Sequence, residues 1–235
     1  MKLNVKVKVK LCLIIIFILV LLYIYYYKKK QTNAPSIKYN NNLHQKAFLI
    51  EIYNFLNDDE INGILKLGIP DLKESNVMGK NKNEIDESVR KSETTYLDDT
   101  NLLINIKKKA SNYTKLDWSN AESLQLLRYK PGGKYQAHWD YFIEPEGDNY
   151  KNSIKQGGQR IYTFFIYLND DFTGGETEFP KLNRKIKPKK GKAVFWKNLL
   201  DDGTPNEFTL HSGNTVHSGI KYGCNLWIRE RQFKL

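Results

Sequence analysis

The longest apolar run in the chain lies near its N-terminus. Residues 11–27 (LCLIIIFILVLLYIYYY) contain no charged residue, and lysines stand on both sides of the run. A helix of this length rises about 25 Å, close to the thickness of the hydrocarbon core of a bilayer. Tyrosines gather at its end, where an aromatic belt would meet the lipid headgroups. The pattern predicts a transmembrane signal anchor over 11–27, preceded by a cytosolic tail over 1–10.

A cleavable signal peptide is the alternative reading of the same run. No small residues follow it, however, and it ends in Tyr-Tyr-Tyr-Lys-Lys-Lys, so we expect the segment to be retained. The slight excess of positive charge before the run favours a cytosolic N-terminus. The chain is therefore predicted to be a single-pass type II membrane protein with its main domain in the lumen of the endoplasmic reticulum. The sequon at Asn112 would fit a lumenal glycoprotein.

Polar residues and an asparagine run fill 28–45, so we expect a tether there and a single domain over 46–235. Within that domain a capping pattern, Asn-Asp-Asp-Glu at 57–60, predicts the start of an amphipathic helix. Asp-Asp-Thr at 98–100 predicts a second helix, and the lysines at 107–109 are suited to its C-terminus. The first part of the domain is thus expected to be helical.

The pattern changes after about residue 123. Short runs rich in β-branched and aromatic residues alternate with clusters of Gly, Pro, Asn and Asp, which is typical of an all-β sandwich or barrel. The predicted fold is therefore mostly β with flanking α-helices. The expected strands are 124–129, 135–142, 160–168, 192–196, 215–221 and 224–231.

Composition narrows the class of protein. The chain has 235 residues, of which 40% are hydrophobic and 13% aromatic, enough for one packed core. Its net charge is +11, but residues 1–36 hold seven lysines and no acidic residue. This leaves 30 basic against 26 acidic residues over 37–235, a net charge of +4. Since the excess charge lies outside the domain, we expect no nucleic-acid partner.

His138 and Asp140 form the first candidate for chemistry. They stand in a run with strand character, where residues i and i+2 point to the same side. With one more histidine they would make a two-histidine, one-carboxylate set, the arrangement typical of non-haem Fe(II) oxygenases. Three histidines could supply that ligand: His44 in the tether, which is a poor candidate, and His211 and His217 in the β region.

Four blocks of sequence carry a resemblance to a known family. They appear in the order and spacing of the prolyl 4-hydroxylases, which are 2-oxoglutarate- and Fe(II)-dependent dioxygenases. The chain resembles that family over about 121–231, and the resemblance implies a double-stranded β-helix (jelly roll) core. The blocks are LLRYKPGGKYQAHWDYF (126–142), GGQRIYTFFIYLNDDFTGGETEFP (157–180), KPKKGKAVFW (187–196) and LHSGNTVHSGIKYGCNLWIRE (210–230).

The resemblance implies which residues hold the metal and the cosubstrate. In the family the distal histidine follows a leucine and stands ten positions before a lysine, which selects His211 and Lys221 and leaves His217 out. Lys221 would then bind the distal carboxylate of 2-oxoglutarate by a charge-assisted hydrogen bond. No side chain need act as acid or base. The implied metal ligands are His138, Asp140 and His211, and the implied cosubstrate residues are Lys221, Tyr129 and, as the weaker candidate, Thr163.

The resemblance also implies the reaction and its substrate. Proline in a peptide would be hydroxylated at C4 while 2-oxoglutarate and O₂ are converted to succinate and CO₂, with L-ascorbate restoring oxidised iron. Tyr135, Arg160 and Trp227 match positions that face the peptide, and a proline-rich or collagen-like chain in the polyproline II form would dock on such aromatic surfaces. Residues 141–158 stand where the family often has a mobile loop, a candidate lid. No particular oligomeric state is implied.

Two alternatives differ from this reading. The same oxygenase chemistry could act on another acceptor, such as peptidyl lysine, although lysyl hydroxylases usually carry an arginine in place of Lys221. The chain could instead be an inactive, membrane-tethered domain that binds peptides, which the intact set of metal-binding residues disfavours.

Overall fold

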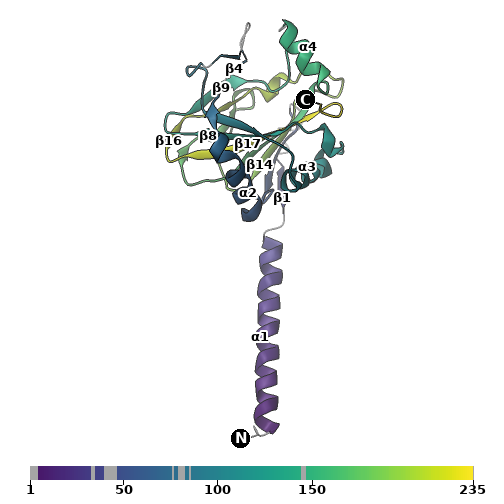
Figure 1. The fold of residues 1–235 in the computed structure, drawn as a ribbon, viewed down its shortest axis with the longest axis vertical. Helices are drawn as coiled ribbons and strands as arrows, with labels where there is room; N and C mark the ends of the chain where they lie inside the picture. Colours follow the sequence, from purple (N-terminus) through teal and green to yellow (C-terminus); the bar gives the residue numbers. More distant parts are fainter. Residues whose placement is uncertain are drawn as a thin grey trace. The chain divides into compact units, whose positions relative to one another are not determined.

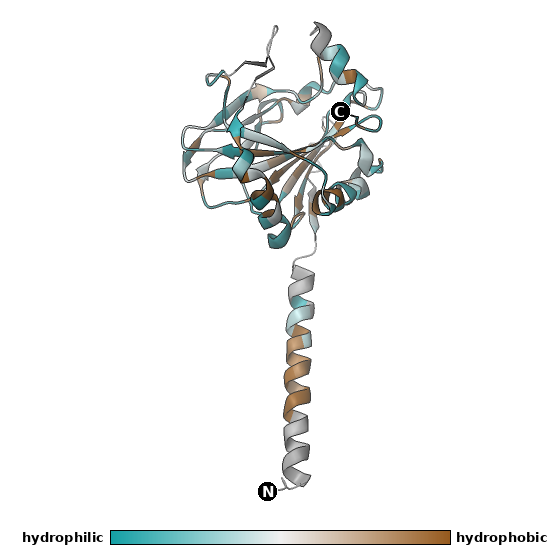
Figure 2. Ribbon diagram, viewed as in Figure 1, coloured by the Kyte–Doolittle hydropathy of each residue, from teal (hydrophilic) through white to brown (hydrophobic). Residues whose placement is uncertain are grey.

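The computed structural model describes residues 5–32, 35–39, 47–75, 77–78, 83–84, 86–143 and 147–234 (Figure 1). The chain divides into two units, Met1–Pro35 and Ser36–Leu235. In the first unit, Val5–Thr32 form helix α1. The large apolar side chains that the structure describes in this helix, over 14–26, are exposed, and the brown stretch of α1 in Figure 2 marks the most hydrophobic part of the helix.

The prediction of a membrane span is wrong. A helix needs about 20 consecutive, mainly apolar residues to cross the hydrocarbon core of a bilayer. Among the residues that the structure describes, no helix is both long enough and apolar enough to do so. This finding overturns the predicted single-pass, type II localisation with a domain in the lumen of the endoplasmic reticulum, and it gives no support to the membrane as a partner.

Two helices of the second unit begin where the sequence predicts. Helix α2 (Asp58–Gly68) starts with a complete capping box, in which the Asn57 side chain accepts from the Glu60 amide and Glu60 accepts from the Asn57 amide. Helix α3 (Asn101–Thr114) has Thr100 as its N-cap and continues past the lysine cluster to a left-handed C-cap at Lys115. A third, α4 (Gly147–Lys155), was not expected. Short 3-10 turns are η1 (Ile69–Asp71), η2 (Trp118–Asn120), η3 (Pro180–Leu182) and η4 (Glu207–Thr209).

The strands form two main antiparallel sheets. The larger has eight strands in the order β1-β2-β14-β10-β17-β8-β7-β3, and the smaller has five in the order β13-β12-β15-β9-β6. This mostly antiparallel β architecture with flanking helices agrees with the predicted jelly roll. The larger sheet comprises β1 (Ser36–Tyr39), β2 (Leu49–Tyr53), β14 (Ala193–Lys197), β10 (Arg160–Tyr167), β17 (Lys221–Arg229), β8 (Leu124–Tyr129), β7 (Glu93–Leu97) and β3 (Lys73–Glu74). The smaller comprises β13 (Arg184–Ile186), β12 (Thr177–Phe179), β15 (His211–Gly213), β9 (Lys134–His138) and β6 (Arg90–Lys91); two further pairs are β11 (Thr173–Gly174) with β16 (Val216–Ser218) and β4 (Val77–Met78) with β5 (Asn83–Glu84).

Each face of the larger sheet has its own apolar core. Helices α2 and α3 cover one face (Figure 1), and their buried residues Ile61, Ile64 and Ile106 pack with Phe164 and Phe195 of the sheet. The other face packs against the smaller sheet, in a second core that includes Phe179 and Trp196. Burial on both faces explains why β10 and β14 are apolar at nearly every position.

Strand periodicity decides which side chains reach the space between the two sheets. Along β10, Phe164 and Ile166 belong to the core under the helices, whereas Phe165 and Tyr167 belong to the core between the sheets. The same alternation in β17 sends Cys224, Leu226 and Ile228 toward the helices. The intervening residues of that strand face the other way. Polar side chains that the sequence singled out therefore share one face of the sheet: Tyr129, Thr163, Lys221 and Trp227.

Several segments differ from the prediction. The expected strand 215–221 is divided between β16 and the start of β17, and the expected strand 135–142 ends at His138. Residues 36–39, within the expected tether, form strand β1, which pairs with β2 at the edge of the larger sheet. Part of the candidate lid forms helix α4, and its last turn is fastened to β17 because an Arg229 guanidinium N–H donates to the main-chain oxygen of Ser153. Residues 40–46, with His44, and residues 144–146 lie outside the described residues.

Candidate active site

Strand pairing brings two of the predicted metal ligands together. His138 is the last residue of β9 and His211 the first of β15, and the antiparallel register of these strands sets them directly opposite each other. Their imidazole centroids are 4.3 Å apart. A contact between residues so far apart in sequence depends on the register of the smaller sheet, which the local sequence pattern does not contain.

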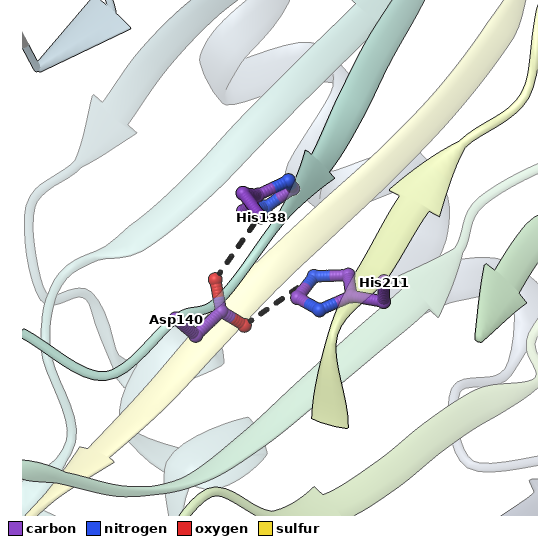
Figure 3. A group of neighbouring side chains, drawn as sticks. All are labelled: His138, Asp140 and His211. Atoms are coloured by element: carbon purple, nitrogen blue, oxygen red, sulfur yellow. Dashed lines mark ion pairs between the residues drawn. The ribbon is translucent and has the colours of Figure 1, made fainter. Parts of the chain in front are cut away.

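Asp140 completes the group from a bend that follows β9. Its Oδ1 lies 3.8 Å from Nε2 of His138 and its Oδ2 lies 3.7 Å from Nε2 of His211. Figure 3 shows the carboxylate between the two imidazoles. The candidate ligand atoms of the three residues all lie within 4.8 Å of one another. Trp139, between the two ligands in sequence, points elsewhere and donates its indole N–H to the main-chain oxygen of Glu207 at 3.1 Å.

Main-chain carbonyl groups orient both imidazoles. Nδ1 of His138 lies 2.8 Å from the oxygen of Gln136, and Nδ1 of His211 lies 3.0 Å from the oxygen of Thr209. A carbonyl oxygen can only accept, so Nδ1 carries the proton in each ring and the Nε2 lone pair is left for a metal. Two imidazoles and one carboxylate are a donor set that suits Fe(II) and leaves coordination positions open.

The electrostatics of His138 and Asp140 also suit metal binding. Burial, and after it the neighbouring His211, lower the pKa of His138 to about 3, so this ring is neutral at physiological pH. Burial alone would raise the pKa of Asp140, but the two histidines, Arg160 and the Thr163 hydroxyl hold it below its usual value. The carboxylate is therefore ionised and can act as a ligand.

Thr163 contacts this group directly. Its hydroxyl donates to Oδ2 of Asp140 at 2.8 Å, and it accepts from the amide of Asn198 at 2.9 Å. The expected contact of Thr163 with 2-oxoglutarate stays a prediction, since its hydroxyl hydrogen is already engaged here.

Lys221 and Tyr129 lie side by side on the same face of the larger sheet. They are directly paired across β17 and β8, and Nζ of Lys221 lies 5.0 Å from the centroid of the Tyr129 ring. The side chain of Lys221 is 1% exposed and donates to the main-chain oxygen of Gly175 at 2.7 Å. No carboxylate among the described residues forms an ion pair with it. Burial lowers the pKa of Lys221 to about 7, only partly opposed by Glu176.

The three predicted peptide-facing residues line the same cleft as His138 and Asp140 of the candidate metal-binding group. The Arg160 guanidinium lies 3.7 Å from the ring centroid of Trp227 and forms a bidentate pair with Glu122 at 2.7 and 2.8 Å. The ring of Tyr135 stacks on His138 with centroids 3.7 Å apart, and Arg90 lies over the same ring. A cleft of about 890 Å³ opens over this surface, and its walls include Tyr135, His138, Asp140, Arg160 and Trp227.

The structure adds residues that sequence reasoning missed. Glu122 is buried and accepts from Arg229 as well as Arg160, which together lower its pKa against the effect of burial. Arg90 is also buried, and it forms no ion pair with a described carboxylate. Neither stands in a local motif. Glu122 precedes the apolar strand β8, whereas Arg90 begins the short polar strand β6, and charged residues are rarely buried at such positions without a partner.

His217 does not join the group. It is exposed on β16, which pairs with β11 in a separate two-stranded sheet. Among the residues that the structure describes, His211 lies beside His138 and Asp140, and His217 does not.

Comparisons with known proteins agree with this geometry. The model of the 2OG-Fe(II) oxygenase superfamily matches residues 124–229. Prolyl 4-hydroxylase 2 of Arabidopsis thaliana is 34% identical over 212 residues, covering 80% of this chain and 68% of that protein. Prolyl 4-hydroxylase subunit alpha-2 of Gallus gallus is 33% identical over 186 residues, and the chain covers 34% of its length.

Solved structures give the same result. The viral collagen prolyl hydroxylase of Paramecium bursaria Chlorella virus-1, in its 2OG complex, is 30% identical with a TM-score of 0.61, covering 77% of this chain and 96% of that one. The chain belongs to the 2OG-Fe(II) oxygenase superfamily and within it to the prolyl 4-hydroxylase type, as its sequence blocks predicted.

Proposed function

We propose that the protein hydroxylates peptidyl proline at C4, with conversion of 2-oxoglutarate and O₂ to succinate and CO₂. The observation that carries this proposal is the group of two imidazoles and one carboxylate beside a cleft whose walls include His138 and Asp140. His138, Asp140 and His211 would hold Fe(II). Bound there, the ion would supply the O₂-dependent oxidation that none of the protein's own side chains can perform. L-ascorbate would keep the iron reduced.

Lys221 would receive the distal carboxylate of 2-oxoglutarate. A buried ammonium without a carboxylate partner is costly, and an incoming anion would remove that cost. The rings of Tyr129, Phe165 and Tyr167 enclose the Lys221 Nζ at 5.0, 5.0 and 5.5 Å. They exclude water and so strengthen the attraction between the ammonium and a carboxylate. The hydroxyl of Tyr129 would be a second donor to the same carboxylate.

The peptide would lie along the cleft over Arg160 and Trp227. Nε1 of Trp227 is buried and has no hydrogen-bond partner among the described residues. An unsatisfied buried donor costs about 1–3 kcal/mol, and a main-chain carbonyl of a bound peptide would satisfy it. Aromatic rings of Tyr135 and Trp227 suit the flat, apolar rings of proline, and a polyproline II chain presents carbonyl groups that make no internal hydrogen bonds. The name of the viral relative, a collagen prolyl hydroxylase, supports a collagen-like substrate.

The test uses the full-length chain with Fe(II), ascorbate and 2-oxoglutarate. Succinate and a gain of one oxygen atom in mass are measured on (Pro-Pro-Gly) repeats, and on matched peptides carrying lysine as the only candidate acceptor. Hydroxyproline equimolar with succinate is the expected result. Hydroxylysine instead would change the acceptor but keep the oxygenase chemistry, whereas no succinate and no bound iron would reject the proposal in favour of a peptide-binding domain.

Trp227→Phe tests the peptide site. This variant keeps an aromatic ring under Arg160 but removes the unpartnered N–H. We expect the KM for peptide to rise about tenfold, the effect of one hydrogen bond to a buried donor, with the KM for 2-oxoglutarate unchanged. An unchanged peptide KM would place the peptide elsewhere.

A further inference from the structure

A chain of buried hydrogen bonds leads from β14 to the carboxylate of Asp140. The indole N–H of Trp196 donates to Oδ1 of Asn198 at 2.8 Å. The Asn198 amide nitrogen donates to the hydroxyl of Thr163 at 2.9 Å, and that hydroxyl donates to Oδ2 of Asp140 at 2.8 Å. Trp196, Asn198 and Thr163 are each 1% exposed or less.

The direction of this chain follows from its first member. An indole nitrogen can only donate, so it must face the oxygen of the Asn198 side chain and thereby turns the amide nitrogen toward Thr163. Thr163 then accepts with its oxygen and has its single hydrogen left for Asp140. Each of the three side chains thus donates once along the chain, which ends on an ionised acceptor, where hydrogen bonds are strongest.

A second set of hydrogen bonds links Asn198 to His211. The main-chain oxygen of Asn198 accepts from the Asn206 amide at 2.9 Å, and Asn206 is the N-cap of turn η4. The Thr209 hydroxyl donates to the oxygen of Asn206 at 2.7 Å, and the oxygen of Thr209 faces Nδ1 of His211 at 3.0 Å. Asn198 therefore supports two of the three candidate ligands from one buried position.

We propose that Thr163, Asn198 and Trp196 are positioning residues that hold the Asp140 carboxylate in the orientation needed for metal binding. This inference rests on the proposed metal site. The hydrogen bond from Thr163 to one oxygen restrains rotation of the carboxylate about its Cβ–Cγ bond. Packing alone does not require these polar groups. Apolar side chains of similar volume could fill the same space and would bring no buried donors or acceptors that need partners. Groups that orient metal ligands in this way typically change metal affinity by about 10- to 100-fold when lost.

The experiment compares Thr163→Val with Thr163→Ser in the full-length chain. Valine has nearly the same shape but no hydroxyl, whereas serine keeps the donor. Co(II) is titrated without 2-oxoglutarate, and its absorption in the visible region gives both the Kd and the coordination geometry. We expect Thr163→Val to weaken binding about 10-fold or more and to alter the spectrum, and Thr163→Ser to stay within about threefold of the parent.

A matched control separates this role from general stability. Thr114 is another buried threonine, in α3, whose hydroxyl accepts from the Leu116 amide at 3.2 Å. Thr114→Val is expected to lower the melting temperature without changing the Co(II) Kd or spectrum. If Thr163→Val does not fold, Trp196→Phe removes the first donor of the chain while keeping a ring, and a Kd raised about two- to fivefold is expected from the lost polarisation of the chain.

The outcomes are distinguishable. If Thr163→Val binds Co(II) with the wild-type affinity and spectrum, the positioning role is overturned. The same result in Trp196→Phe overturns it if Thr163→Val does not fold. A raised KM for 2-oxoglutarate with unchanged Co(II) binding would also overturn it, and would assign Thr163 to the cosubstrate. Failure of the unmodified protein to bind Co(II) would instead reject the metal site itself.

Discussion

Replacing Lys221 with methionine tests the inner end of the site most sharply. Lys221 is 1% exposed, and among the described residues its ammonium has one hydrogen-bond acceptor, the main-chain oxygen of Gly175. Methionine has a similar length and no charge, so it can occupy the same space. Two effects of opposite sign are expected: the protein without cosubstrate becomes more stable, and 2-oxoglutarate binds more weakly.

The magnitude of the first effect follows from the pKa of Lys221. Burial lowers this pKa from 10.5 to about 7, which corresponds to about 5 kcal/mol of unfavourable free energy for the charged form. The unfolded chain binds the proton up to about pH 10.5 and the folded protein only up to about pH 7. Stability contributed by this group is therefore lowest below pH 7 and rises as the pH increases from 7 to 10.5. Lys221→Met removes this dependence and should raise the free energy of unfolding at pH 7 by up to about 5 kcal/mol.

The second effect concerns the cosubstrate. Loss of one partner from a buried ion pair typically costs about 3–5 kcal/mol, so the Kd for 2-oxoglutarate should rise at least about 100-fold. Calorimetric titration in the presence of Co(II) measures this Kd, and urea denaturation at pH 6.5, 8 and 9.5 measures stability. Co(II) affinity in the absence of 2-oxoglutarate should be unchanged.

Lys192 is a matched control for this prediction. It is 2% exposed, but its ammonium pairs with Glu51 at 2.8 Å. Lys192→Met leaves the Glu51 carboxylate with fewer partners and should lower the free energy of unfolding, with no change in 2-oxoglutarate affinity. If Lys221→Met destabilises the protein as Lys192→Met does, the burial argument is refuted. An unchanged Kd for 2-oxoglutarate would remove Lys221 from the cosubstrate site.

Two further predictions concern the metal and the peptide side of the cleft. His211→Ala should abolish Co(II) binding while His217→Ala leaves it intact, and the reverse result in the same titration would overturn the ligand assignment. Glu122→Leu should lower the free energy of unfolding by about 3–5 kcal/mol, because the buried Arg229 and the half-buried Arg160 lose their common carboxylate. Glu207→Gln removes a charge from an exposed ion pair and should change the free energy of unfolding by less than about 1 kcal/mol. Equal effects of Glu122→Leu and Glu207→Gln in urea denaturation would contradict the reasoning.

Local sequence determined most of the elements. Leu124–Tyr129 forms a strand with the predicted bounds, and the capping pattern at 57–60 starts a helix, because both signals depend on residues that are neighbours in the chain. The spacing of His138 and Asp140 also predicted their proximity, although the strand ends at His138 and a bend carries Asp140. Family resemblance, more than periodicity, identified the fold and reaction class.

Tertiary structure decided how distant residues meet. Local pattern left His211 and His217 as alternatives, and only the pairing of β15 with β9 sets His211 opposite His138. The hydrogen bonds from Asn198 to Thr163 and the pairing of Glu122 with Arg160 likewise join segments far apart in the chain. Sheet register depends on how both faces of each strand pack, and a shift by one residue would turn every side chain to the opposite face. The sequence by itself therefore determined which chemical groups are available, while the packing of the two sheets decided which of them share a site.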